Sequence, residues 1–172
     1  MTRVALLVVD MLHDFLDPQG ALYCGDAARE IIPQVQALIE TYRGRGGIII
    51  FVSDRHAPDD AEFRLFPPHC VVGTKGAEMI PELTTLPGDR HITKHRYSAF
   101  FQTPLEDILL EEKVDEVHIC GVCTSICVME TASDLRNREY PTLVHRLAVG
   151  DFDPEAHAFA LKRMVRILGA QV

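Results

Sequence analysis

Two long apolar runs constrain the fold of this chain more than any other feature of its sequence. They occupy residues 3–9 (RVALLVV) and 48–53 (IIIFVS) and show no alternation of polar and apolar side chains. Strands with both faces buried have this pattern, which is typical of parallel sheets covered by helices. Further strands are predicted at 116–121 and 142–148, with a short one at 90–93.

Helical patterns separate these strands. Apolar side chains recur at helical spacing between 27 and 43, with Asp26 as the expected N-cap and Pro33 marking a turn before the helix proper. Other helices are predicted at 124–137 and after Asp153. The last should turn these residues toward the core: Ala156, Phe159, Ala160, Met164, Val165 and Leu168. The alternation predicts one α/β domain over residues 1–172, with three α/β/α layers around a mainly parallel sheet.

Polar residues follow the predicted strands at the point where each one ends. Asp10 follows the first strand, Asp54 the second and Lys94 the short one, while a tight turn at 121–127 follows the strand at 116–121. The carboxyl ends of parallel strands share one edge of the sheet, and ligands bind there in open α/β folds. We therefore expect these residues to meet although they lie far apart in the sequence.

Cys127 is the candidate nucleophile. It lies in the first turns of a predicted helix, near unpaired N–H groups and the positive end of the helix dipole, which favour a thiolate. Lys94 would stabilise that thiolate, and Asp10 could take the thiol proton and later give it to a leaving amine. Singly, Asp10 is equally well explained as a turn residue and Lys94 as a surface charge. Their joint placement indicates acyl transfer, with N–H groups of the turn holding the oxyanion.

A second set of polar residues indicates a metal. Asp54 and His56 stand two positions apart after the second strand, and Glu62 and His69 follow in a polar, Pro-rich stretch that extends to about residue 88. Two imidazoles and a carboxylate suit zinc, manganese or ferrous iron. Histidines in loops are more often merely solvated, so the residues alone leave a metal-free site open.

The remaining cysteines allow a redox interpretation. Cys120 and Cys123 form a C-x-x-C pair, but Cys120 falls inside a strand rather than at a helix start. A redox-sensing protein would bond these two residues reversibly. Cys24 and Cys70 show no partner in the sequence. Five cysteines are an odd number and do not suit the framework of a secreted domain.

Composition narrows the class of partner. The formal net charge of −8 argues against nucleic acid and anionic membranes. No apolar run reaches the ~18 residues of a membrane span. We expect a cytoplasmic protein that acts on a small molecule.

Several motifs together resemble the nicotinamidase/pyrazinamidase group of the isochorismatase-like cysteine hydrolases. They are Asp10…Phe15, Asp54-x-His56, FPPHCVVGTKG at 66–76, Lys94-x-x-Tyr97-Ser98-Ala99-Phe100 and GVCTSICV at 121–128. The match extends from residue 4 to residue 170. The resemblance implies the Rossmann-like fold of that superfamily and a homo-oligomer.

The resemblance also implies roles for individual residues. Cys127 would be the nucleophile, Asp10 the general acid/base and Lys94 the third member of the triad. A cis peptide between Val122 and Cys123 would orient the N–H groups of Cys123 and Cys127 as the oxyanion hole. Zinc is the first choice of metal, with manganese or ferrous iron as alternatives. Its implied ligands are Asp54, His56, His69 and, as in a subset of bacterial members, Glu62.

The implied reaction is the deamination of nicotinamide to nicotinate and ammonia through a thioester, as in NAD salvage. Phe15, Phe66 and Tyr97 would form an aromatic slot for the flat ring. Phe66 stands where the family commonly has Trp, a residue this chain lacks.

Two alternatives stay open. One is a metal-free hydrolase of the same superfamily, acting on another small amide or ester. The other is a non-catalytic binding protein, which would have no use for a thiolate beside an ammonium.

Overall fold

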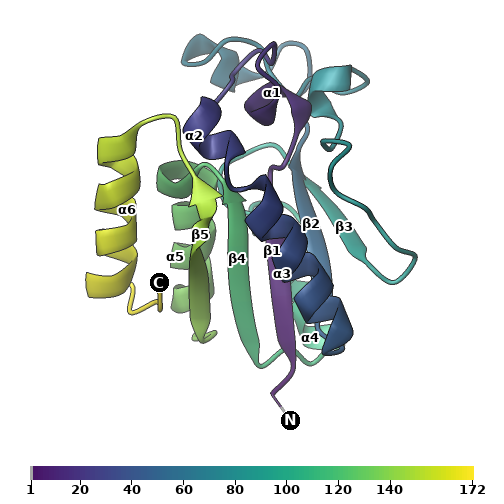
Figure 1. Cartoon of the computed structure of the whole chain (residues 1–172), viewed down its shortest axis with the longest axis vertical. Helices are drawn as coiled ribbons and strands as arrows, with labels where there is room; N and C mark the ends of the chain where they lie inside the picture. The colour runs from purple at the N-terminus through teal and green to yellow at the C-terminus, as the bar shows by residue number, and fades with distance from the viewer. Residues whose placement is uncertain (1) are drawn as a thin grey trace.

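A five-stranded, wholly parallel sheet organises residues 2–172, the part of the chain that the computed structural model describes (Figure 1). Its strands are β1 (Val4–Val9), β2 (Ile48–Asp54), β3 (Arg90–Lys94), β4 (Glu116–Val122) and β5 (Thr142–Gly150). They lie in the order β3-β2-β1-β4-β5, so the chain builds outward from β1 in one direction and then in the other. This arrangement confirms the predicted fold class, and it places a topological switch point between β1 and β4.

Helices cover both faces of the sheet, as the continuous apolar runs require. One buried cluster joins Leu6 and Val8 of β1 to α1 (His13–Leu16), α2 (Asp26–Arg29) and α3 (Ile32–Gly44). The other joins Leu7 and Val9 to α4 (Leu105–Glu111), α5 (Met129–Asn137) and α6 (Pro154–Arg166). Successive side chains of a strand point to opposite faces, so β1 contributes to both clusters. Figure 1 shows α3 in front of the sheet and α5 behind it.

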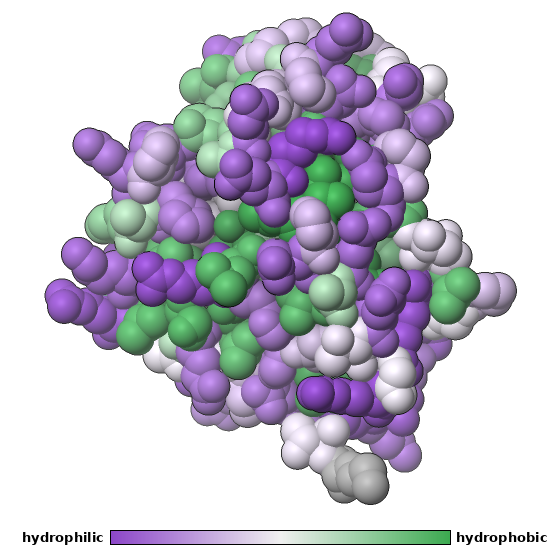
Figure 2. Space-filling view, in the orientation of Figure 1, coloured by the Kyte–Doolittle hydropathy of each residue, from purple (hydrophilic) through white to green (hydrophobic). Residues whose placement is uncertain are grey.

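Two details of the predicted helices are wrong. The segment 27–43 forms two helices, and Asp26 lies inside the first, where its carboxylate accepts a hydrogen bond from the Tyr23 hydroxyl (2.6 Å) instead of capping the helix. The second helix begins beside Pro33, which confirms the turn predicted before the helix proper, because proline tolerates only the first turn of a helix. In α6, Phe159 and Val165 are 61% and 49% exposed. Figure 2 shows hydrophobic residues at the surface over this helix, at the left of the view.

The connection between β2 and β3 is long and contains only two short 3₁₀ helices, Ala61–Arg64 and Lys75–Ala77. It runs over the carboxyl edge of the sheet, where His56 bridges to Val71. Long connections without regular structure are usually functional or disordered, and this one carries His56 and His69. Within residues 2–172, no helix is both long enough and apolar enough to cross a membrane.

Candidate active site

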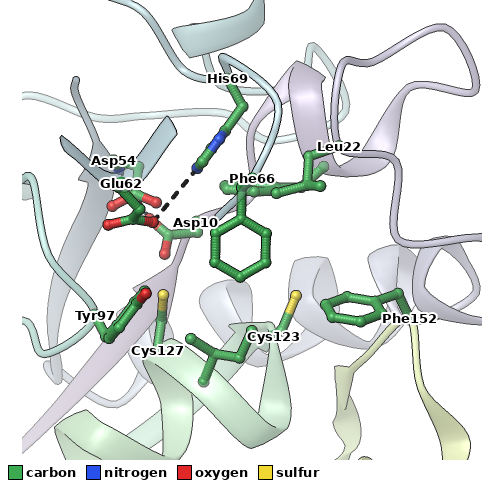
Figure 3. A pocket seen from close by; sticks show the side chains of 12 residues that line it. Asp10, Leu22, Asp54, Glu62, Phe66, His69, Tyr97, Cys123, Cys127 and Phe152 are labelled. Atoms are coloured by element: carbon green, nitrogen blue, oxygen red, sulfur yellow. Dashed lines mark hydrogen bonds and ion pairs between the residues drawn. The ribbon is translucent and has the colours of Figure 1, made fainter. Parts of the chain in front are cut away.

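A small pocket opens at the carboxyl edge of the sheet (Figure 3). About 340 Å³ within it is free of protein atoms, counting the part that is open to solvent. The lining residues are Asp10, Phe15, Leu22, Asp54, Glu62, Phe66, His69, Tyr97, Cys123, Ile126, Cys127 and Phe152.

Lys94 lies at the centre of the polar groups beneath this pocket. Its ammonium is 2.8 Å from Asp10 Oδ2 and 2.5 Å from Asp54 Oδ1. It also donates to Cys127 Sγ at 3.3 Å. The Lys94 side chain is fully buried, so the two carboxylates hold a positive charge directly beside the sulfur. The structure thus brings together the four strand-end positions that the sequence predicted would meet.

The sheet register explains this convergence. Asp54 and Lys94 are neighbours across β2 and β3. Asp10 follows β1, with a left-handed φ of 51°, and its Oδ1 accepts the Asp54 N–H at 2.9 Å. A non-glycine residue in this region of φ is uncommon and is found at turns and functional sites. The turn therefore aims the Asp10 carboxylate across the edge of the sheet, toward Lys94.

Burial sets the proton affinities of the catalytic candidates. It raises the pKa of Asp10 to about 7 with help from the Asp54 charge, and Lys94 opposes the shift. Burial also raises the pKa of the Cys127 thiol, again against the effect of Lys94. In the resting site, then, the thiol keeps its proton until a partner can take it. An ionised Asp10 with a pKa near neutrality is suited both to accept that proton and to return it.

The turn that carries Cys127 has an unusual backbone. The peptide between Val122 and Cys123 is cis, as the resemblance implies. A π-helical turn, Thr124–Val128, follows it and leads into α5. The Cys123 carbonyl accepts the N–H groups of Ile126 (3.2 Å) and Val128 (3.1 Å). π-helical turns are rare and are frequent at functional sites. This one fixes the position of Cys127 relative to Cys123.

Asp54, His56 and His69 form a buried set whose donor atoms all lie within 4.8 Å of one another. His56 Nε2 is buried without a hydrogen-bond partner, while Asp60 Oδ2 holds Nδ1 at 3.1 Å. His69 Nδ1 lies 2.8 Å from the Pro67 carbonyl oxygen, which leaves its Nε2 free to face the set. Metal-binding histidines are held through their second nitrogen in this way. The donor set fits zinc, manganese or ferrous iron.

The charges around Asp54, His56 and His69 also favour a bound cation. Although burial works against it, Asp54 and Asp60 raise the pKa of His56 to about 9, so the surroundings favour a positive charge there. Glu62 adds to the negative charge. Its Oε1 is 3.8 Å from His69 Nε2 (dashed in Figure 3), and its Oε2 is buried without a partner. These atoms place Glu62 beside the set as a possible fourth ligand.

A second set of possible metal ligands, Asp10, Asp54 and Cys127, is also compact. The Lys94 ammonium lies within 3.3 Å of all three side chains. It therefore occupies the place that a cation would take.

The aromatic residues predicted to bind substrate, Phe15, Phe66 and Tyr97, all line the pocket. Sequence reasoning missed Leu22, Ile126 and Phe152, which complete its apolar walls. Phe152 follows β5 by two residues, so the rule that ligands bind beyond the carboxyl ends of strands could have found it. Leu22 carries no comparable signal, because it lies in an irregular loop.

Comparison with known proteins relates the whole chain to one family. The isochorismatase domain family matches residues 4–172. The crystal structure of a nicotinamidase/pyrazinamidase, PncA from Bacillus subtilis, has 38% sequence identity and a TM-score of 0.94, over 99% of each chain. A pyrazinamidase of Pyrococcus horikoshii, crystallised in complex with zinc, has 34% identity and a TM-score of 0.92, over 98% of this chain and 97% of the other. A relative from Arabidopsis thaliana described as a probable inactive nicotinamidase is 33% identical, over 96% and 89% of the two chains.

Proposed function

The chain belongs to the isochorismatase family, and from that premise we propose that it is a metal-dependent amidohydrolase that converts nicotinamide to nicotinate and ammonia. One observation carries the proposal above all others. A buried ammonium lies 3.3 Å from the Cys127 sulfur and 2.8 Å from the Asp10 carboxylate, at the floor of a pocket with a metal-binding donor set in its wall. A protein that only bound its ligand would have no use for this arrangement.

The reaction begins when Cys127 Sγ attacks the carboxamide carbon and its proton passes to Asp10. The N–H groups of Cys123 and Cys127 would stabilise the negative charge that develops on the carbonyl oxygen. Asp10 then gives its proton to the amide nitrogen, the C–N bond breaks, and ammonia leaves a thioester on Cys127. Asp10 next takes a proton from water, which attacks the thioester. Nicotinate is released, and the proton returns to the Cys127 sulfur.

Metal-binding side chains would orient the substrate for this attack. Asp54, His56, Glu62 and His69 would hold the ion, and Asp60 would keep the His56 ring in place. A bound divalent ion would supply a Lewis acid that holds the ring nitrogen of the substrate and so aims the carboxamide at Cys127.

The charge of the pocket favours a neutral substrate. Among the residues that line it, Asp10, Asp54 and Glu62 are acids and none is Lys or Arg. Lys94 is already paired with two of these acids. Lys94 and a bound divalent ion would together balance these three acids, which leaves no surplus positive charge to pair with a carboxylate on the substrate. A flat neutral ring instead fits the aromatic walls.

The test is ammonia release from nicotinamide by protein as purified, stripped with a chelator and then reloaded with zinc, manganese or ferrous iron. We expect activity to disappear on stripping and to return with metal. Cys127→Ala should abolish turnover and still bind metal, whereas Cys120→Ala, which removes a buried thiol of the sheet, should stay active. Turnover by Cys127→Ala near the wild-type rate would refute the nucleophile. Activity that stripping does not change would favour the metal-free hydrolase of the same family.

A further inference from the structure

Cys24 and Cys123 are in contact, although 99 positions separate them in the sequence. Their sulfur atoms lie 3.3 Å apart, and both side chains are buried. The sequence offered Cys120 as the partner of Cys123. In the structure, the Cys120 thiol instead donates to the Leu7 carbonyl within the sheet, at 3.6 Å. The pair that the fold creates is therefore a different one, and the proposed reaction does not use its two thiols.

The two cysteines connect parts of the pocket that lie far apart in the sequence. Cys24 ends the loop that carries Leu22, and its N–H donates to the Phe15 carbonyl at 2.9 Å. Leu22, Phe15 and Cys123 all line the pocket, and Figure 3 shows the Cys123 sulfur in that lining, separate from the sulfur of Cys127. A small solute that enters the pocket would thus reach Cys123 first, with Cys24 behind it.

We propose that Cys24 and Cys123 are an oxidisable pair that a hydroperoxide converts to a disulfide. The Cys123 sulfur, as thiolate, attacks a peroxide oxygen. The O–O bond breaks, and the departing alkoxide or hydroxide takes up a proton, which leaves a sulfenic acid on Cys123. The Cys24 sulfur then attacks the sulfenic sulfur, and the S–O bond breaks. The leaving hydroxyl takes the Cys24 proton and departs as water. Two thiols are oxidised, and one hydroperoxide is reduced to an alcohol, or to water, plus one further water.

The disulfide would act on the turn that holds the nucleophile. A disulfide bond is shorter than the present contact, so oxidation draws the loop and the turn together. The Cys123 carbonyl anchors the N–H groups of Ile126 and Val128 on either side of Cys127. A displacement of about 1 Å at a catalytic group can cost about 100-fold in rate. This expectation rests on the proposed function: cross-linked enzyme should lose about 100-fold in hydrolysis rate and regain it on reduction.

Peptide mapping tests the pair without any substrate. Reduced protein is treated with hydrogen peroxide, quenched in acid, alkylated and digested without reductant. We expect a peptide that joins Cys24 to Cys123, in the wild type and equally in Cys127→Ala. The hydrogen-bond contact between the Cys24 and Cys123 sulfur atoms, together with burial, raises the pKa of Cys123. Cross-linking should therefore accelerate between pH 7 and pH 9. Cys120→Ala should form the same peptide, while Cys24→Ser should not.

Two results would refute the proposed disulfide between Cys24 and Cys123. One is recovery of Cys24 and Cys123 as free thiols after treatment that has oxidised Cys127. The other is a peptide that joins Cys123 to Cys120. Cys24→Ala serves in place of Cys24→Ser if the serine variant does not fold. In the activity arm, peroxide-treated Cys24→Ser should lose less activity reversibly than wild type, because Cys123 and Cys127 can be oxidised but no cross-link can form. Reversible loss equal to that of the wild type would refute the effect on the turn. The mapping result holds whichever amide the enzyme hydrolyses.

Discussion

Replacing Lys94 with Met removes the buried ammonium and keeps a side chain of similar length. The wild-type ammonium contacts Asp10 Oδ2 at 2.8 Å and Asp54 Oδ1 at 2.5 Å, and the Lys94 side chain is 0% exposed. The variant therefore leaves two buried carboxyl groups facing each other without a cation. Removing one partner of a buried ion pair typically costs about 3–5 kcal/mol. For a chain of this length, that corresponds to a fall in Tm of about 6–20 °C.

The loss should depend on pH, and the sign follows from linkage. Without the ammonium, the pKa of Asp10 and Asp54 should rise in the folded protein above the values of the unfolded chain. The folded variant then binds more protons than its unfolded form, so its stability falls as pH rises. The deficit relative to wild type should be larger at pH 8 than at pH 5.

Urea denaturation of metal-free protein at both pH values measures this deficit as the difference in free energy of unfolding. Lys162→Met is the matched control, because Lys162 is exposed on α6 and should change stability by no more than about 0.5 kcal/mol. A Lys94→Met variant within about 1 kcal/mol of wild type at pH 8 would show that the ammonium is not the counterion of both acids. A stability deficit that shrinks as pH rises would refute the predicted rise in the pKa of Asp10 and Asp54.

Three further predictions follow from single contacts. Asp60→Ala should weaken metal binding about 10- to 100-fold by titration, because the carboxylate holds His56 Nδ1; unchanged affinity would refute that role. Burial and His118 lower the pKa of His145 to about 4. His145 should therefore account for about 1–2 kcal/mol of stability lost from pH 6.5 to 4, allowing for solvent screening, and His145→Gln should lose less than wild type by that amount. Gly121→Ala should cost more than about 4 kcal/mol, since a Cβ there, at φ +114°, would lie 1.9 Å from the Val9 carbonyl oxygen. Gly88→Ala, with open space around it, is the control.

Much of the site could be predicted because parallel sheets place strand ends together. Asp10 follows the apolar run of β1, and Asp54 and Lys94 are the last residues of β2 and β3, so the fold rule alone predicts that they meet. The metal set could be predicted as residue types, but not as a geometry. The orphaned Nε2 of His56 and its Asp60 partner depend on how the connection from β2 to β3 returns over the sheet.

Other features depend on contacts that no local pattern encodes. Cys24 meets Cys123 only because the loop before α2 packs against the turn after β4. Pro33 predicted the turn before the helix proper, but no local pattern predicted that the residues before this turn form a short helix of their own, Asp26–Arg29. Phe159 and Val165 were assigned to the core because their spacing is helical. The stripe that α6 buries contains Ala160 and Met164, as predicted, together with Leu161.

Asp54 connects the two halves of the site. Its Oδ1 accepts the Lys94 ammonium at 2.5 Å, while its Oδ2 faces His56 Nε2 at 3.6 Å. Although burial works against it, Lys94 and His56 hold the pKa of Asp54 below its ordinary value, so the carboxylate stays ionised between them. A positive charge at His56 would therefore interact with the same carboxylate that pairs with the Lys94 ammonium beside Cys127. The charge of the metal-binding set and the charge beside the nucleophile are thus coupled through one side chain.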